Sequence, residues 1–338
     1  MAMSGTRRSV GLEIDTGTAR AVEFAGKANA PNLISLGSIP LPEDAVKEGM
    51  IIEPEQVGAA LKKLWLQAGL KERSVLLGVS NQGVLVRHIT IPKVPDDKLK
   101  NIIRYQAQEH LPIPLESVVL DYLVLGESAG SGEGDIVLEV LLIAGRRDML
   151  DKYLEALAIA QLEPQDIDVS SMTMIRLLPP QAMNMTVAMV NVANGLNGIV
   201  ISAMGKPRLA RLGAVKMNDL AESMGCSLEE VINYVLHEEG SQSILNNWIN
   251  NLAGEVRSSI TYYQDQPGSL PVEGILLSGR GSLFQGMAEQ LENYLKLPVR
   301  TFNPLERYSP AKRKLLKTDF DALEYVISAG LAIRGLEG

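Results

Sequence analysis

A repeated pattern of three short strands, present once in each half of the chain, constrains the fold more than any other feature of the sequence. The first pattern reads as strands over Val10–Ile14, Arg20–Phe24 and Leu33–Ile39, with a glycine-containing turn after the first strand. The second begins near residue 186, in TVAMVNVANGLNGIVISAMGKPRLARLG. Helix, strand and helix signals follow each pattern. This internal duplication predicts an α/β protein with two lobes and a cleft between them.

Between the two patterns the sequence predicts an inserted unit. A helix is expected over Pro54–Gly69, because proline suits the first helical turn and glycine ends the helix, and a strand follows over 74–79. The alternation of apolar residues then indicates a strand over 83–91 and a strand pair over 120–125 and 136–144 within the insertion. Between them we expect a helix that is capped by Asp96 and stopped by Pro112 and Pro114. A further helix is expected over about 149–161.

The second half shows helical signals after its three strands. The capping box SLEE at 227–230 begins one helix, and a longer helix carries Leu245 to Ile260. A strand over 274–277 and the glycine turn SGRGS follow. A helix face carrying Phe284, Met287 and Leu291 and a last helix over about 321–334 complete this half. We therefore expect the first lobe to comprise residues 1–79 and 161–185, the insertion 80–160, and the second lobe 186–338, with a helical subdomain at about 217–270.

Charge and cysteine content exclude several classes of function. The 338 residues carry 32 Lys and Arg against 40 Asp and Glu, a formal net charge of −8, so neither nucleic acid nor an anionic membrane is the expected partner. One cysteine and three histidines cannot build a disulfide framework or a Cys/His zinc site, and we expect no metal site and no catalytic residues. Without a signal peptide or a long apolar run, the chain is expected to be cytoplasmic, with no direct membrane insertion.

Several stretches together resemble one known family. They are VGLEIDTGTARAVEF, RYQAQEHLPIPLESVVLDYLVLG, GILLSGRGSLFQGMAEQLENYLKLPVRTFNP and YVISAGLAIRG, and they span nearly the whole chain. In this order they resemble the PilM family of type IV pilus assembly proteins, which lies within the actin-like ATPase superfamily and is close in architecture to FtsA. The resemblance implies a duplicated, actin-like (RNase H-like) fold of two lobes, with a small α/β subdomain inserted.

The resemblance also implies where a nucleotide pocket would lie. Read without gaps, Glu13 keeps the acid of the first phosphate hairpin, but Asp15 stands where the family has glycine, and Arg20 where it usually has lysine. In the other register, Asp15 is the usual acid and DTGT forms the turn. The second hairpin places Asn191 at the family's aspartate and Ala193 at its glycine. The candidate pocket remnants are Glu13, Asp15, Thr16, Gly17, Thr18, Arg20, Asn191, Ala193, Asn194, Gly195, Gly279, Arg280, Gly281 and Ser282.

These departures weaken phosphate and metal binding, because asparagine lacks the charge that holds Mg²⁺ and a second carboxylate repels phosphate. Leu236 also lies near where relatives place a lysine that contacts the nucleotide. We therefore expect ATPase activity to be weak or absent and no cofactor to be bound. The alternative is that ATP with Mg²⁺ still binds and acts as a switch.

The function implied by the resemblance is that of a scaffold, peripheral at the inner membrane. Such proteins bind the N-terminal cytoplasmic peptide of a PilN-like inner-membrane protein and link the membrane platform to the pilus motor ATPase. The candidate peptide groove on the insertion contains Tyr105, Leu111, Ile113 and Leu115. The alternatives are a nucleotide-dependent switch in the same machinery, and the cytoplasmic actin-like component of a type II secretion system.

Overall fold

Two five-stranded sheets with the same strand order form the frame of the molecule. The computed structural model describes residues 7–130, 135–233, 239–308 and 320–337. The first sheet has the order β10-β6-β1-β2-β3, and the second has the order β13-β12-β11-β14-β15. In each sheet three antiparallel strands are extended by two parallel strands on the side of the first strand. The duplication predicted from the sequence is confirmed.

The strands lie close to where the apolar pattern placed them. Those of the first sheet are β1 (Arg8–Asp15), β2 (Thr18–Lys27), β3 (Ala30–Pro40), β6 (Ser74–Val79) and β10 (Glu163–Val169). Those of the second are β11 (Thr186–Asn191), β12 (Leu196–Ala203), β13 (Lys206–Lys216), β14 (Gly274–Ser278) and β15 (Val299–Thr301). A short pair, β4 (Val46–Lys47) and β5 (Met50–Ile51), precedes the first helix.

Helices cover the outer face of each sheet. On the first sheet these are α1 (Pro54–Ala68) and α3 (Arg147–Ile159), whose apolar residues share one core with Val10, Leu12 and Ile14. On the second they are α5 (Met217–Met224), α7 (Glu239–Gln264) and α8 (Met287–Leu295), which pack on Ala188 and Val190. Because strand side chains alternate between faces, intervening positions such as Val22, Phe24, Met189 and Val200 face a second core between the sheets.

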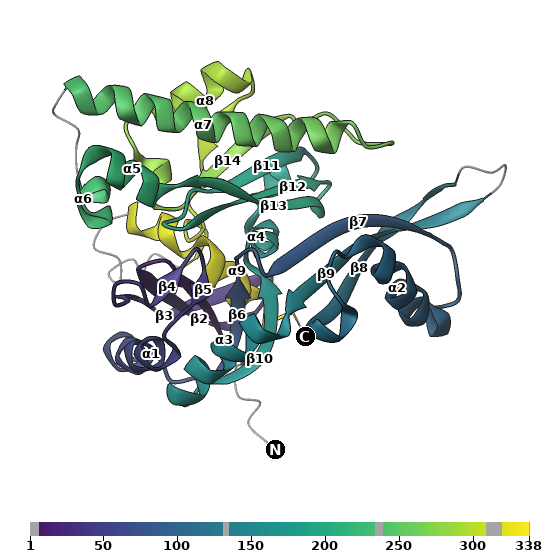
Figure 1. Ribbon diagram of the computed structural model, residues 1–338, viewed down its shortest axis with the longest axis horizontal. Coiled ribbons are helices and arrows are strands. Elements are labelled where there is room, and N and C mark those ends of the chain that lie inside the picture. The colour runs from purple at the N-terminus through teal and green to yellow at the C-terminus, as the bar shows by residue number, and fades with distance from the viewer. Residues whose placement is uncertain (1–6, 131–134, 234–238, 309–319, 338) are drawn as a thin grey trace.

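A layer between the two sheets joins the lobes (Figure 1). It contains α4 (Ser170–Thr173), the 3₁₀ helix η2 (Met174–Leu177), the 3₁₀ helix η6 (Phe320–Tyr325) and α9 (Val326–Arg334). The helix α9, which follows the second sheet in the sequence, contacts β1, β2 and β6 of the first sheet, whereas α4 contacts β12 and β13 of the second. Each half of the chain thus contributes an inner helix to the other half.

The insertion forms a separate three-stranded antiparallel sheet with the order β7-β9-β8. Its strands are β7 (Val84–Pro92), β8 (Val118–Ala129) and β9 (Ile136–Arg146), and it projects away from the lobes in Figure 1. The helix α2 (Asp96–His110) covers one face, where Leu99, Ile103 and Ala107 are buried. The remaining short helices are α6 (Leu228–Asn233) and the 3₁₀ turns η1 (Leu115–Ser117), η3 (Pro180–Ala182) and η4 (Arg280–Leu283).

The ends of the helices test several predictions made from the sequence. The capping box at 227–230 is confirmed: Glu230 N donates to Ser227 Oγ over 3.2 Å, and Ser227 N donates to Glu230 Oε2 over 2.7 Å. Asp96 is not a cap, because Pro95 holds that position and Asp96 is the first helical residue. The last predicted helix is divided into η6 and α9. Phe284 precedes α8, and Leu236 lies outside the described residues.

Of the helices in the described part of the chain, none combines the length and the apolar character needed to cross a lipid bilayer.

Candidate functional site

The candidate site lies where a turn of the first lobe meets a loop of the second. Thr16 and Gly17 connect β1 to β2, with Gly17 at a φ of 73°, and residues 192–195 connect β11 to β12. The side chain of Asn194 reaches across and donates from Nδ2 to the carbonyl oxygen of Thr16 over 3.1 Å. The two loops that the sequence identified as phosphate-hairpin remnants are therefore in direct contact.

The carboxylate of Asp15 makes the main polar contact between the lobes. Its Oδ2 accepts a hydrogen bond from Asn194 N over 3.1 Å, and its Oδ1 accepts one from Gly195 N over 3.2 Å. Thr16 N also donates to Oδ1 over 2.7 Å. The pKa of Asp15 is raised overall, because the effect of burial outweighs the opposite effects of the Arg20 charge and of these three N–H donors. All three hydrogen-bond partners are donors, which is the environment of an ionised, acceptor-only carboxylate.

Every N–H group of the 192–195 loop is used within the protein. Val192 N donates to Ser278 O over 2.9 Å, and Ala193 N donates to Asn197 Oδ1 over 3.1 Å. The other two donors, of Asn194 and Gly195, bind Asp15. The loop therefore has no backbone N–H group left to offer to a phosphate.

Arg20 is the centre of a buried charge cluster and is only 3% exposed. Its Nη1 lies 3.6 Å from Glu13 Oε2 and 3.8 Å from Asp15 Oδ2, and its Nε donates to Glu324 Oε2 over 3.1 Å. Arg280 binds the other oxygen of Glu324, with Nε 2.8 Å from Oε1. Burial alone lowers the pKa of Arg20, but the Glu13, Glu324 and Asp15 carboxyl groups outweigh it and the net pKa is raised.

Glu13 is the member of this cluster whose burial is least offset by hydrogen bonds and ion pairs. Its Oε2 is buried and has no hydrogen-bond partner. Burial raises the pKa of Glu13 to about 8, although Arg20 lies close enough to act in the opposite direction. The 3.6 Å separation permits an ion pair, but Arg20 is already bound by Glu324 and flanked by Asp15, so desolvation dominates at Glu13. With its pKa raised to about 8, Glu13 is expected to be largely protonated at neutral pH.

A pH titration of stability tests this protonation state. Because the pKa of Glu13 rises from 4.5 to about 8 on folding, the folded protein holds an extra proton between these values, and Glu13 lowers stability progressively as the pH rises through them. Glu13→Gln should therefore become more stable relative to the wild type as the pH goes from 5.5 to about 8.5. Urea unfolding of both proteins across this range measures the difference, with Glu109→Gln, at an exposed glutamate, as the control. A difference that does not vary with pH would contradict the assignment.

The glycine turn predicted from SGRGS completes the site. Gly279, at a φ of 82°, donates from N to Leu323 O over 3.0 Å, and Gly281 N donates to Val192 O over 3.2 Å. Ser282 Oγ donates to Gly279 O over 2.6 Å. The turn begins a 3₁₀ helix rather than an α-helix, and it packs on the β11–β12 loop. The three predicted segments thus come together, except that Thr18 Oγ1 points to Ile39 O, away from the interface.

The space enclosed between the lobes is very small. A cavity of about 10 Å³ lies among Glu13, Asp15, Asn191, Ala193 and Gly198. One water molecule needs roughly 10–15 Å³, and pockets for small molecules are typically about 300–1,000 Å³. A nucleotide does not fit this arrangement of the loops. In the described ranges, no group of three or more His, Cys, Asp or Glu side chains is placed to hold a metal ion.

Sequence reasoning missed two residues of the site, Glu324 and Asn197. Glu324 belongs to η6 and is 304 positions from Arg20, so only the need to neutralise a buried arginine could have pointed to an acid of this kind. Asn197 fixes the 192–195 loop from within its own hairpin by accepting Ala193 N and donating from Nδ2 to Val215 O over 2.7 Å. An asparagine just after a turn gives only a weak signal of this role.

The four predicted peptide-groove residues lie on the insertion but differ in exposure. Tyr105 is 63% exposed on α2. Leu111 is buried in the core beneath α2, and Ile113 and Leu115 pack against that core from the chain that follows. Tyr105 is therefore the member of this set whose side chain is most available to a partner.

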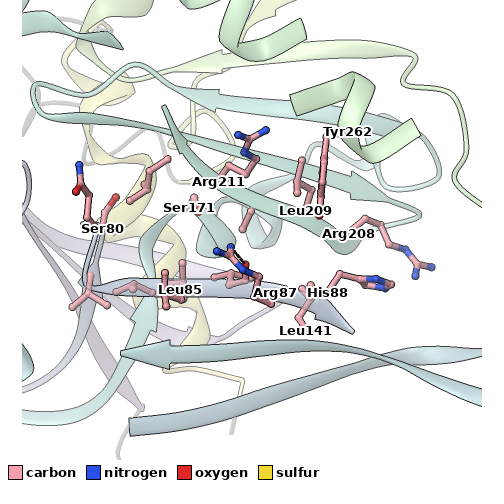
Figure 2. Close-up of a pocket in the computed structure, with 17 residues that line it drawn as sticks. Ser80, Leu85, Arg87, His88, Leu141, Ser171, Arg208, Leu209, Arg211 and Tyr262 are labelled. Carbon is pink, nitrogen blue, oxygen red and sulfur yellow. Dashed lines mark hydrogen bonds between the residues drawn. The ribbon is translucent and has the colours of Figure 1, made fainter. Parts of the chain in front are cut away.

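A larger groove lies between the insertion and the second lobe. It has a volume of about 530 Å³ and runs between β7 and β13, which are the edge strands of their sheets among the described residues. Figure 2 shows Arg87 and His88 on β7 opposite Arg208, Leu209 and Arg211 on β13. Burial lowers the pKa of His88. Sequence reasoning did not find this groove, because its walls come from two strands whose edges meet only in the folded chain.

Comparison with known proteins identifies a family that matches nearly the whole chain. The family model for type IV pilus assembly protein PilM matches residues 11–336. A solved PilM-PilN type IV pilus biogenesis complex matches with a TM-score of 0.85 and 27% identity, over 98% of this chain and 99% of that chain.

Two further structures show the same fold at lower identity. The ethanolamine utilization protein EutJ from Carboxydothermus hydrogenoformans matches with a TM-score of 0.58 and 13% identity, over 97% of this chain and 89% of that one. MreB 5 of Spiroplasma citri, bound to AMPPNP, matches with a TM-score of 0.51 and 11% identity, over 96% and 95%. These likenesses confirm the actin-like fold.

Proposed function

The chain belongs to the PilM family of type IV pilus assembly proteins, and we propose that it is a scaffold that binds the N-terminal segment of a PilN-like membrane protein. The observation that carries the proposal is the likeness, over almost the entire chain, to a protein solved as a complex with PilN. Through such a partner the protein would be held at the inner membrane and would link it to the pilus motor. We propose the division into a first lobe at 1–79 and 161–185, an insertion at 80–160 and a second lobe at 186–338, although α3, at the end of the insertion, packs on the first sheet. The three-stranded sheet of the insertion would provide one wall of the binding site.

The groove between β7 and β13 is the best candidate for the peptide. Edge strands present unpaired N–H and C=O groups, and an extended peptide can bind such an edge by adding a strand. The volume of about 530 Å³ suits a few side chains of a short segment. Arg87, Arg208 and Arg211 line the groove, and Glu139 neutralises one of them by binding Arg208 over 2.8 Å. An extended segment with apolar and acidic side chains fits this lining.

The interlobe site supports a scaffold without ATP turnover. Asp15 occupies the N–H groups that a phosphate would need, burial raises the pKa of Glu13 to about 8, and Asn191 stands where the family resemblance implies the acid that would hold Mg²⁺. We propose that the protein retains the ATPase fold but not the activity. Titration with ATP and Mg²⁺ to millimolar concentration, followed by calorimetry, tests this: measurable binding with hydrolysis would contradict it.

A binding experiment tests the peptide site. A fluorescent peptide with the cytoplasmic N-terminal sequence of a PilN-type protein from the same organism should bind the wild type, as measured by anisotropy. Val86→Arg places a long side chain in the groove, and Arg211→Glu reverses a charge at its wall, so each should weaken binding at least tenfold, or by about 1.4 kcal/mol. Circular dichroism checks that both variants fold.

The matched control is Tyr105→Ala, which removes an exposed side chain on α2, away from the groove lining. It should leave the affinity unchanged. If Tyr105→Ala weakens binding while the two groove variants do not, the peptide binds on α2. If the wild type binds no such peptide, the scaffold proposal itself is wrong.

A further inference from the structure

We infer that Asp15 is a built-in replacement for a bound anion, whose carboxylate fills the N–H site of the 192–195 loop and holds the two lobes together without a ligand. The inference goes beyond the peptide-binding role and does not depend on it. A carboxylate resembles a phosphate in that it offers only acceptor oxygens to converging N–H groups. Here both oxygens are engaged by the opposite lobe, through Asn194 N at 3.1 Å and Gly195 N at 3.2 Å.

The surrounding contacts are built for this direct approach of the loops. A Cβ atom at Gly195 would lie 2.7 Å from Thr16 Oγ1 and 3.0 Å from Asp15 Oδ1, so the loop can come this close only because residue 195 has no side chain. Asn194 adds a second link by donating to Thr16 O. The remaining cavity of about 10 Å³ leaves no room for a phosphate group beside the carboxylate. The Asp15 side chain therefore both links the two lobes and occupies the N–H groups that an anion would bind.

The charge around Asp15 shows what its removal would leave behind. Arg20 Nη1 lies 3.8 Å from Asp15 Oδ2, and three backbone N–H groups point at the same carboxylate, two from the opposite lobe and that of Thr16 from the same lobe. Without the carboxylate, these groups would surround an unfilled space lined with donors and next to a positive charge. Such a space should accept a small carboxylate from solution. Acetate supplies the atoms that Asp15→Gly removes, and it is the probe for the test.

Hydrogen exchange with acetate rescue tests the inference. In the wild type, the amides of Asn194 and Gly195 should be protected, and neither acetate nor ATP with Mg²⁺ should change their exchange rates. In Asp15→Gly the two amides should exchange at least tenfold faster. Added sodium acetate should restore their protection with saturation, whereas sodium chloride at the same ionic strength should not. Asp121→Gly is the matched control, because Asp121 also accepts the N–H of the next residue, over 2.8 Å, but is exposed on β8.

A second variant keeps the test valid if Asp15→Gly fails to fold. Asp15→Asn has nearly the same volume but turns an NH₂ group toward the backbone donors at one of the two oxygen positions, which weakens the link between the loops. The amides of residues 194 and 195 should again exchange at least tenfold faster while the strands stay protected. The inference is overturned if Asp15→Asn protects these amides as well as the wild type does. It is also overturned if acetate and chloride act alike on a folded Asp15→Gly, or if ATP with Mg²⁺ alters exchange at these amides in the wild type.

Discussion

Gly11→Ala should lower the free energy of unfolding by about 3 kcal/mol or more, which is large for the addition of one methyl group. Gly11 lies in the middle of β1, directly beneath α9 of the inner layer. A Cβ atom there would lie 2.0 Å from Ser328 O and 2.6 Å from Ala332 N. Both are backbone atoms of a helix, so no side-chain rotation can relieve the clash. The helix would have to move away from the strand, and the packing between the first sheet and α9 would be lost.

Urea unfolding of the wild type and the variant measures this effect. Gly254→Ala is the matched control, because Gly254 lies within α7 and its nearest neighbour to an added Cβ is Tyr294 Oη at 3.9 Å. Alanine favours a helix interior over glycine by about 1 kcal/mol, so this substitution should stabilise the protein. Equal effects of the two substitutions would show that α9 is not held tightly against β1.

Arg20→Met should be the most damaging charge removal in the interlobe site. It leaves the buried Glu13 and Asp15 without their cation, whereas Glu324 keeps its ion pair with Arg280. Removal of one partner from a buried ionic group costs about 3–5 kcal/mol. Arg20 favours the charged forms of Glu13 and Asp15, so its loss raises the pKa of both further. Without Arg20, ionisation of either buried carboxyl group destabilises the folded protein. The stability deficit of the variant should therefore be greater at pH 8 than at pH 5.5.

The control is Arg146→Met, at a surface arginine whose side chain is 52% exposed and paired with Asp148. Surface ion pairs contribute about 0–1 kcal/mol, so this variant should remain close to the wild type at both pH values. Chemical unfolding at pH 5.5 and pH 8 gives all the values needed. A small, pH-independent loss for Arg20→Met would mean that the Glu13 and Asp15 carboxyl groups are neutral or hydrated without Arg20.

The elements that were predictable from the sequence are those with a strong local signal. The strands β1 and β2 and the Pro54 and Gly69 boundaries of α1 appear close to where the sequence placed them. The Ser227–Glu230 capping box has the expected reciprocal hydrogen bonds. Asp96 shows the limit of such reasoning: an acidic residue before an apolar face can be the cap or the first helical residue, and only the backbone conformation decides.

The candidate site was predictable as a list of residues but not as a set of contacts. The sequence indicated that Asp15 stands at an unsuitable place for phosphate binding, yet nothing in it showed that Asn194 and Gly195 would bind that side chain. Those partners lie 179 and 180 positions away, and their approach depends on how two whole lobes pack. The same holds for Glu324 beside Arg20, and for the groove between β7 and β13.

The exchange of inner helices has a consequence for the order in which the protein can be made. The first lobe is synthesised early, but the face of its sheet that lies beneath α9 stays uncovered until the ribosome has produced residues 326–334. Domains that are contiguous in sequence can fold one after another during synthesis. Here the early lobe must wait for the late helix, and the nascent chain exposes an apolar sheet face in the meantime. We therefore expect the first lobe to reach its native packing only after residues 326–334 have been synthesised, together with the second lobe.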